Sequence, residues 1–384
     1  MTQPSSTLSL LLLCAKVHHS KDALQQLKNL LNTQNIQPKE LITLAYQHAV
    51  LPLVYQTLKS HFPKHPLCHS LRPYFLQTAQ TNLSMSAHLV TLLALFKTHS
   101  IDALAFKGVA LAEMVYHDTS LRQFGDLDIL IKPKDKEKAI YLMQNNGYIP
   151  EIHFKESTQK TFLHAVNVLG FHHPSSHIYI EIHWELLSKN YAITWDEALL
   201  WDKIHPLTLH QKTIHSLAFE PHFLYLCVHS SKHLFERLLW VCDIDRCVRN
   251  EKHIAWQHLL DIAQTIGIHR MVLLSLSLAH TLLDLPIPQE IQDKINQDKM
   301  IKILQNHIIK QQFTNPHPKS KGYNTFKLLW QMRETPKDKL LFLYLALFAT
   351  KFDDFKFIQL PSYLAFLYPM VRIFRLGVKY FRLG

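Results

Sequence analysis

Hydrophobic positions recur every three or four residues over most of the chain, which is typical of amphipathic helices. The pattern predicts helices over 24–34, 39–61 and 75–98, with a break at the proline-containing stretch 62–74. The helical period returns at about residue 191 and continues nearly to the end. Prolines divide that last region, among them Pro286, Pro288, Pro316, Pro318, Pro336 and Pro361. The pattern therefore predicts a mostly helical protein.

The pattern changes between residues 101 and 186. Residues 101–108 form a short apolar run that predicts a buried strand, and 126–132 and 178–186 alternate between apolar and polar positions as strands do. The intervening stretches 108–117 and 134–148 have the helical period. Strands that alternate with helices predict an α/β unit.

These changes divide the chain into three expected parts. They are a helical N-terminal segment over 1–78, an α/β core over 79–190 and a larger helical C-terminal region over 191–384. A length of 384 residues is ample for two or three such parts with a sizeable core.

The composition narrows the classes of function. A hydrophobic fraction of 47% with 18% charged residues is that of a globular protein. The chain has only 8 glycines and contains neither the G-x-G-x-x-G motif of dinucleotide-binding folds nor the G-x-x-x-x-G-K-[ST] motif of P-loop proteins. The scarcity of glycine also argues against an all-β fold with many tight turns.

Cysteine usage and hydropathy bear on the location of the protein. Five dispersed cysteines without a C-x-x-C motif predict no disulfide framework and favour a reducing cytoplasm. No apolar stretch reaches the roughly 18 residues of a membrane span, and we expect neither a span nor a signal peptide. The formal net charge of +11 is compatible with an RNA acceptor, but no RNA-binding motif accompanies it.

The clearest chemical signal is the pair Asp126 and Asp128 on the strand predicted over 126–132. The two-residue period of a strand places both carboxylates on one face. Neighbouring carboxylates repel each other, and a hard cation such as Mg²⁺ relieves that repulsion by accepting oxygen ligands. The alternative is a pair of exposed acids at a strand edge.

Three more features favour the metal interpretation. Lys107 and Gly108 stand between a strand and a helix, where backbone N–H groups bind anions and glycine allows a phosphate to approach. Arg122 adds a second cation four residues before Asp126. Glu181 and His183 lie on the strand face opposite Ile178, Ile180 and Ile182. Glu181 is therefore a candidate third carboxylate, as two-metal phosphoryl or nucleotidyl transfer requires.

The chain resembles uncharacterised bacterial nucleotidyltransferases of the polymerase-β-like superfamily. The resemblance lies in FKGVALAEMVYHDTSLRQFGDLDILI (106–131), EIHWEL (181–186), HSSKHLFERLLWVCDIDR (229–246) and LPSYLAFLYPMVRIFRL (360–376). It implies an α/β nucleotidyltransferase core with a small mixed sheet and a helical partner domain. It also implies transfer of a nucleotidyl group from ATP or another NTP. The superfamily more often has Gly-Ser or Gly-Gly where this chain has Lys107-Gly108, and Asp where it has Glu181.

The resemblance, which matches Asp126, Asp128, Gly108 and Glu181, and the residue pattern around them together suggest roles for individual residues. Asp126, Asp128 and Glu181 would hold Mg²⁺ or Mn²⁺ and form the catalytic group, with His183 as an auxiliary proton acceptor. Lys107, Gly108 and Arg122 would bind the nucleotide. The acceptor, whether small molecule, protein or RNA, is not identified. Two alternatives are a catalytically degenerate protein that binds a nucleotide or a partner, and a toxin-like nucleotidyltransferase that modifies tRNA.

Two further clusters are open to a chemical or a structural interpretation. His229 and His233 are one helical turn apart, with Cys242 and Cys247 downstream, but a zinc site needs three or four converging ligands. We favour a structural role for them. Asp243 and Asp245 repeat the D-x-D spacing, but on a helix residues two apart do not share a face. We expect salt bridges or a helix terminus there, with a place in the cleft as the alternative.

The chain ends in a basic helix. Arg372, Arg375, Lys379 and Arg382 are spaced to form one stripe on a helix among apolar residues. We expect this helix to pack on the body of the protein with the stripe in solvent. Contact of the stripe with anionic lipid or with nucleic-acid phosphate is the alternative.

Overall fold

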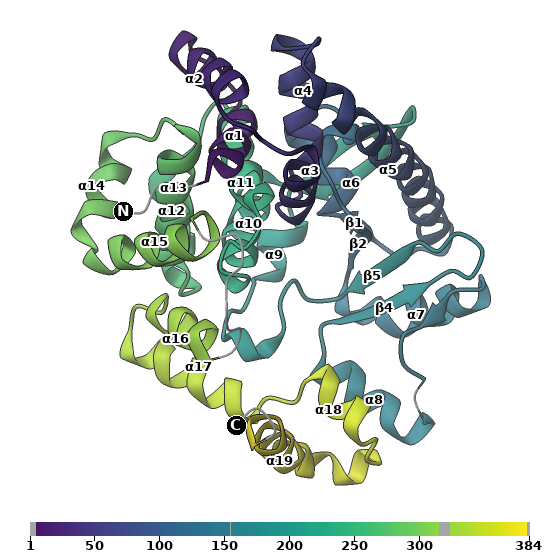
Figure 1. Ribbon diagram of the computed structural model, residues 1–384. Coiled ribbons are helices and arrows are strands. Elements are labelled where there is room, and N and C mark those ends of the chain that lie inside the picture. The colour runs from purple at the N-terminus through teal and green to yellow at the C-terminus, as the bar shows by residue number, and fades with distance from the viewer. Residues whose placement is uncertain (1–4, 154, 315–322, 382–384) are drawn as a thin grey trace.

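The computed structural model describes residues 5–153, 155–314 and 323–381. The described chain begins with helices, as the hydrophobic period predicts, but there are five of them and the stretch expected as one helix over 39–61 is divided into α3 and α4 (Figure 1). The five helices are α1 (Ser6–Ala15), α2 (Lys21–Thr33), α3 (Pro38–Gln47), α4 (Leu51–His61) and α5 (Pro66–Thr98).

The break expected over 62–74 is wrong in its extent, because α5 already begins at Pro66. A proline in the first turn costs no hydrogen bond, and the His65 side chain caps the helix by accepting from the Leu67 N–H at 3.2 Å. Pro73 lies inside the helix. Packing compensates for the hydrogen bond that Pro73 removes, since the neighbouring Phe75 ring stacks on Tyr55 with a centroid distance of 4.5 Å.

The predicted small mixed sheet in a mostly helical chain is confirmed. Five strands lie in the order β1-β2-β5-β4-β3, and only β2 and β5 pair in parallel. The strands are β1 (Ala103–Ala105), β2 (Asp126–Ile131), β3 (Ile149–Pro150), β4 (Val168–His172) and β5 (Tyr179–His183).

The apolar face of the sheet is covered by helices of the same part of the chain. Leu127, Ile129, Ile180 and Ile182 alternate with polar residues along β2 and β5 and are fully or almost fully buried. They share one core with side chains of the helices that connect the strands. These helices are α6 (Gly108–Tyr116), α7 (Lys136–Asn145) and α8 (Glu156–Ala165).

The expectation that the chain is helical from about residue 191 is wrong for one segment. A hairpin of β6 (Ile204–Leu209) and β7 (Lys212–Leu217) forms there. Its two-residue turn, His210 and Gln211, has positive φ at both positions but lacks the glycine or asparagine that usually marks such a turn. Burial of alternate residues on the core of the sheet decides the conformation, and those residues are Leu207, Leu209 and Ile214.

The rest of the described part of the chain is mostly helical, as predicted. A second core joins the first four helices to those that follow the hairpin, so residues far apart in sequence lie side by side (Figure 1). The division of the chain at residues 78 and 190 stays a prediction. The helices are α9 (Glu197–Trp201), α10 (Phe219–Lys232), α11 (Leu238–Asn250), α12 (Trp256–Thr265), α13 (His269–Leu283), α14 (Gln289–Gln297), α15 (Lys299–Gln312), α16 (Tyr323–Gln331), α17 (Pro336–Phe348), α18 (Phe352–Phe357) and α19 (Tyr368–Phe381).

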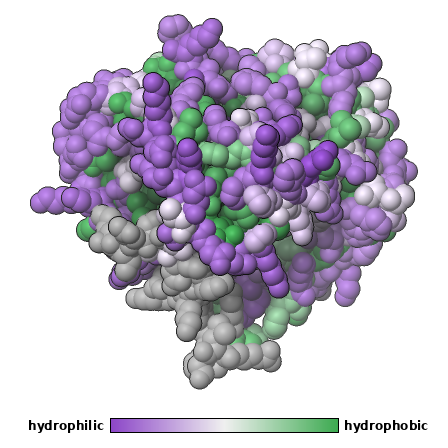
Figure 2. Space-filling view, turned by 45° about the horizontal axis from the view of Figure 1, so that its top comes forward, coloured by the Kyte–Doolittle hydropathy of each residue, from purple (hydrophilic) through white to green (hydrophobic). Residues whose placement is uncertain are grey.

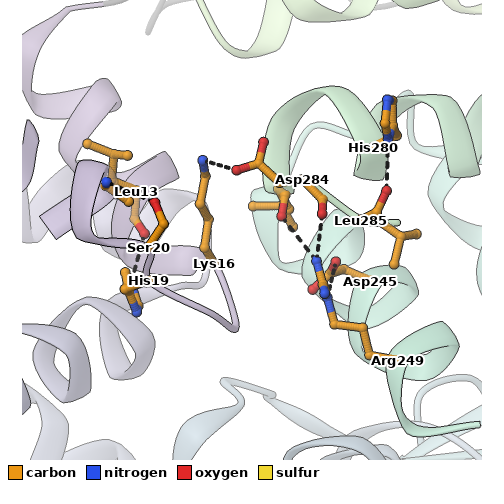
Figure 3. A network of polar contacts seen from close by, with 11 residues as sticks. Leu13, Lys16, His19, Ser20, Asp245, Arg249, His280, Asp284 and Leu285 are labelled. Atoms are coloured by element: carbon orange, nitrogen blue, oxygen red, sulfur yellow. Dashed lines mark hydrogen bonds and ion pairs between the residues drawn. The ribbon is translucent and has the colours of Figure 1, made fainter. Parts of the chain in front are cut away.

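Polar contacts at the end of α13 tie this second core together (Figure 3). Lys16, just after α1, forms an ion pair with Asp284, and Arg249 of α11 donates to the carbonyl oxygen of Asp284 at 2.9 Å. Arg249 also pairs with Asp245 at 2.8 Å. The prediction that Asp245 forms a salt bridge is therefore confirmed.

In the described residues no helix is long and apolar enough to cross a membrane. All five cysteines are buried and free of disulfide bonds, as expected. The cytoplasmic location stays a prediction.

His48 makes the stability of the fold depend on pH. The ring is buried, stacks on Phe313, and accepts a hydrogen bond from the Leu238 N–H at Nδ1, which requires this nitrogen to be unprotonated. Burial lowers the pKa of His48 to about 4, below the ordinary value of 6.5 that it regains on unfolding. Between these two values the unfolded chain binds the proton and the folded chain does not, so stability falls as the pH falls.

We therefore expect the titration of His48 to lower the free energy of unfolding by about 2 kcal/mol when the pH falls from about 7 to about 5. Urea unfolding at the two pH values measures the loss. His48→Asn retains an acceptor near the position of Nδ1 but cannot be protonated, so this variant should lose about 2 kcal/mol less than the wild type. An equal loss in both proteins would contradict the expectation.

Candidate functional site

The parallel pairing of β2 and β5 creates the candidate site. Asp128 lies directly beside Glu181 in the register, and Asp126 lies beside Tyr179. Since side chains alternate along a strand, Asp126, Asp128, Glu181 and His183 share one face of the sheet. The opposite face carries the isoleucines of the core. The predictions that Asp126 and Asp128 share a face of their strand, and that Glu181 and His183 share a face of theirs, are confirmed.

His183 joins the two strands through its ring. Its Nε2 lies 3.2 Å from Asp128 Oδ1 and 3.1 Å from Glu181 Oε2. The side chains of Asp128 and His183 are 1% and 6% exposed, whereas that of Glu181 is 28% exposed. Glu181 is therefore the member of this group that solvent or a substrate reaches most easily.

Lys107 supplies the positive charge that Asp128 needs in this buried place. Its ammonium group forms an ion pair with Asp128. Burial alone would raise the pKa of Asp128, but Lys107 and then His183 hold that pKa below its usual range. Asp128 is thus a carboxylate with cationic or polar partners on two sides.

Asp126 is the second carboxylate of the pair and is half-buried. The Asp128 carboxylate, and then burial, raise the pKa of Asp126 to about 6. Such a shift is the electrostatic consequence of two neighbouring negative charges. A divalent cation at this face would relieve it.

The turn between β1 and α6 brings Lys107 to this face. Gly108 begins α6 with φ +50°, a conformation that side chains other than glycine rarely adopt. A Cβ atom at Gly108 would lie 3.1 Å from the carbonyl oxygen of Asp126. Glycine therefore lets the start of α6 approach β2 closely, with Lys107 next to Asp128.

Arg122 forms its ion pair with Asp243 of α11, and among the described residues it forms none with the acids of the sheet. Its Nε and one terminal nitrogen each donate to an oxygen of Asp243 at 2.9 Å, and the Tyr116 hydroxyl donates to the same carboxylate at 2.7 Å. All three side chains are buried or nearly so. The salt bridge predicted for Asp243 is confirmed, and it anchors the loop before β2 to the helical region.

Helix α10 adds three residues that the sequence did not single out for this site. Tyr225, His229 and Lys232 are spaced to share one face of a helix. The Tyr225 hydroxyl interacts with Lys107, and the Tyr225 ring meets Phe106 edge-on at 5.2 Å. The stretch 229–246, which carries part of the family resemblance, contains His229 and Lys232, but Tyr225 lies before it.

Lys232 is the second cation near the carboxylates. Its charge interacts with Glu181 and Asp128, and its Nζ lies 5.5 Å from the centre of the Tyr191 ring. Burial, and then repulsion by Lys107, lower the pKa of Lys232 to about 8. Within the part of the chain that the structure describes, no carboxylate lies within ion-pair distance of Lys232. An anionic ligand would supply the missing countercharge.

The zinc alternative has no support in the described residues. His229 and His233 contact each other and the Trp240 ring, as the structural interpretation predicts. In this part of the chain, the group of ligand side chains close enough to hold a metal ion is Asp128, Glu181 and His183, whose ligand atoms lie within 4.8 Å of one another.

The donors at the site fit a hard divalent cation. Carboxylate oxygens suit Mg²⁺ and Mn²⁺, and an imidazole nitrogen is tolerated better by Mn²⁺. The ring proton of His183 lies on Nε2, because the two carboxylates that this nitrogen contacts can only accept hydrogen bonds. The buried Nδ1 has no hydrogen-bond partner among the described residues. For Nε2 to bind a cation, the ring would have to release that proton or carry it on Nδ1 instead.

Comparison with known proteins identifies a family for most of the chain. Residues 34–284, about two thirds of the chain, match the family described as uncharacterised nucleotidyltransferase. No curated protein matches the chain. One solved structure that resembles it is a crystal structure of an antigenic nucleotidyltransferase-like protein from Paracoccidioides brasiliensis. That match has 12% sequence identity and a TM-score of 0.31, and it covers 49% of this chain and 89% of that chain.

Proposed function

Because the chain belongs to the family of uncharacterised nucleotidyltransferases, we propose that it transfers a nucleotidyl group from an NTP to an acceptor in a metal-dependent reaction. The observation that carries the proposal is the meeting of carboxylates from β2 and β5 on one face of the sheet, beside Lys107 and within electrostatic range of Lys232. Nucleotidyl transfer needs carboxylates that hold a divalent metal ion, and it needs positively charged side chains nearby that bind the phosphates.

Each residue of the site has a role in this proposal. Asp126, Asp128 and Glu181 would hold Mg²⁺ or Mn²⁺, which when bound neutralises charge on the phosphates. Lys107 and the first N–H groups of α6, opened by Gly108, would bind the phosphate oxygens. Glu181, the more exposed of the two acids in contact with His183, would complete the metal site or take the proton of the acceptor.

Arg122 and Lys232 would act at different distances from bound phosphates. Arg122 is held by Asp243, so its role would be to position the loop before β2 and to act on Asp126 at longer range. Lys232 has no carboxylate partner in the described residues and is free to pair with a phosphate. We therefore add Lys232 to the proposed nucleotide site.

Labelling identifies the reaction and the acceptor. The purified protein is incubated with each α-labelled NTP, Mg²⁺ or Mn²⁺ and total cell extract, and the extract is separated into protein, RNA and small molecules. Label in one fraction that is absent with Glu181→Gln supports the proposal and reveals the class of acceptor. Binding of NTP without labelling of any fraction would favour a degenerate binding protein, and label confined to tRNA would favour a toxin-like activity.

Replacement of the two lysines should weaken nucleotide binding. We expect Lys107→Met and Lys232→Met each to raise the Kd for Mg-ATP by about tenfold, the equivalent of one lost charge-assisted hydrogen bond. Calorimetry with Mg-ATP and with Mg-tripolyphosphate measures the effect. Both ligands should lose affinity equally if the lysines bind phosphates.

Lys189→Met serves as the matched control. This lysine donates to the carbonyl oxygen of His164 and lies outside the proposed site. Its replacement should leave the Kd for Mg-ATP unchanged. An unchanged Kd in Lys232→Met would remove that residue from the nucleotide site, and a loss for ATP but not for tripolyphosphate would assign it to the base or ribose.

A further inference from the structure

The last helix is turned so that its charged side faces the protein. In α19, Arg375 Nε donates to Asp354 Oδ1 at 2.7 Å, and Arg372 Nε donates to the carbonyl oxygen of Ala346 at 3.1 Å. Arg372 is 3% exposed. The expected stripe of arginines in solvent is therefore wrong for these two residues, because α17 and α18 bind them. The side chain of Lys379 and the whole of Arg382 lie outside the described residues.

The apolar side of the same helical segment faces outward. The 3-10 turn Ser362–Leu367, which runs directly into α19, exposes large hydrophobic side chains at a three- to four-residue spacing that α19 continues. Their exposed fractions run from 48% to 78%. They are Tyr363, Phe366, Met370, Ile373 and Phe374. An amphipathic helix on a soluble protein normally has the opposite orientation.

Helix α17 extends this surface. It packs against α19, and Phe342 is the one residue of α17 that is buried. A helix that is hydrophobic all round is normally enclosed by protein or lipid, but α17 exposes Leu340, Leu341, Tyr344 and Leu347. We call the exposed hydrophobic side chains of α17, of Ser362–Leu367 and of α19 the C-terminal apolar face.

Exposed hydrophobic residues are concentrated in this part of the chain. In the described part, 11 of the 19 exposed large hydrophobic side chains fall between residues 340 and 374. The face shown in Figure 2 is mostly hydrophilic, with hydrophobic residues showing between polar ones. Scattered hydrophobic residues are ordinary, but a concentrated exposed set marks an interaction site.

The charge of the segment indicates what covers the face. Residues 336–384 contain eight lysines and arginines but only three aspartates and no glutamate, a surplus of five positive charges. A second copy of the chain would bring the same positive charge, and a net charge of +11, to the contact. An anionic lipid surface offers the opposite charge together with an apolar interior. Aromatic residues, which this face contains, favour the interface of a bilayer.

We propose that the C-terminal apolar face binds the surface of an anionic lipid bilayer. The proposal does not depend on the transferase activity. Helix α19 lies parallel to the bilayer, its hydrophobic side chains enter the headgroup region, and nearby lysines such as Lys337 and Lys356 contact anionic headgroups. The ion pairs of Arg372 and Arg375 with α18 keep the apolar side of α19 outward.

Vesicle flotation with the full chain tests the proposal. We expect binding to vesicles of phosphatidylcholine with phosphatidylglycerol, and binding weaker by at least about tenfold to phosphatidylcholine alone. The double variant F366E/F374E should reduce binding to the anionic vesicles by at least about tenfold. High salt should weaken binding by the wild type without abolishing it, because apolar insertion is not screened.

Two measurements make the result decisive. The double variant L83E/Y141E changes two equally exposed hydrophobic residues outside the face, and it should bind vesicles like the wild type. Circular dichroism checks that both double variants are folded. Failure of the wild type to bind anionic vesicles overturns the proposal. A wild-type dimer in sedimentation analysis that F366E/F374E converts to a monomer would instead identify an interface between two copies.

Discussion

Asp128→Asn is expected to abolish nucleotidyl transfer and to weaken Mn²⁺ binding by more than about 100-fold. Loss of a group that only hydrogen-bonds to a metal ligand typically weakens metal binding by about 10- to 100-fold, so the expected loss is that of a direct ligand. Asp128 is the one acid of the site that contacts both Lys107 and His183, and it lies beside Glu181 on the neighbouring strand. Its removal takes away the carboxylate that connects the metal group to the phosphate-binding lysine. Calorimetry with Mn²⁺ and the labelling reaction measure the two effects.

The same substitution leaves Lys107 without its charge partner, which is expected to cost about 3–5 kcal/mol of stability. The double variant Lys107→Met/Asp128→Asn separates this loss from the loss of metal, since it removes both charges and should still not bind Mn²⁺. Asp102→Asn is the matched control, because Asp102 forms an exposed ion pair with Lys132 at the edge of the same sheet. Near wild-type Mn²⁺ affinity in folded Asp128→Asn would remove Asp128 from the metal group.

Asp243→Asn is expected to destabilise the fold by about 3–5 kcal/mol, because it leaves the buried guanidinium of Arg122 without a countercharge. Asp243 accepts from Arg122 at both oxygens and from Tyr116 at one, and it joins the loop before β2 to α11. Urea unfolding followed by tryptophan fluorescence measures the change in free energy.

The reason for this loss can be tested by removing both charges. Arg122→Met/Asp243→Leu should recover most of the stability, because a buried ion pair replaced by apolar groups of similar size is often nearly neutral. An equal loss in the single and the double variant would show that packing, and not the unpaired charge, decides the effect. Asp261→Asn, an exposed acid on α12, should change the free energy by less than about 0.5 kcal/mol.

Local pattern was sufficient for the elements that carry the site. The alternation of apolar and polar residues predicted the strands that contain Asp126 and Glu181, and it predicted which face each side chain occupies. Local pattern failed where burial by distant residues decides the conformation. The hairpin of β6 and β7 has a turn without glycine, and α5 continues through Pro73 because its side chains pack on α4.

The contacts between elements depended on the tertiary structure. Nothing in the spacing indicated that Arg122 would pair with Asp243, 121 residues away, or that Lys232 would interact with the acids of the sheet. A sequence pattern specifies which side of an element is polar. The packing of the whole chain determines which residues contact that side. The same reason explains α19, whose arginines were expected in solvent and are bound by α17 and α18.

By itself, the sequence determined a mostly helical chain with a small α/β unit, and a face of that unit on which carboxylates gather. It could do so because the two-residue and 3.6-residue periods are local properties of the backbone. Only the tertiary structure decided that β2 and β5 are parallel neighbours, that His183 contacts Asp128 and Glu181, and that α10 brings Lys232 to them. These contacts join residues far apart in the chain, and their stability comes from burial and charge pairing, which no local pattern contains.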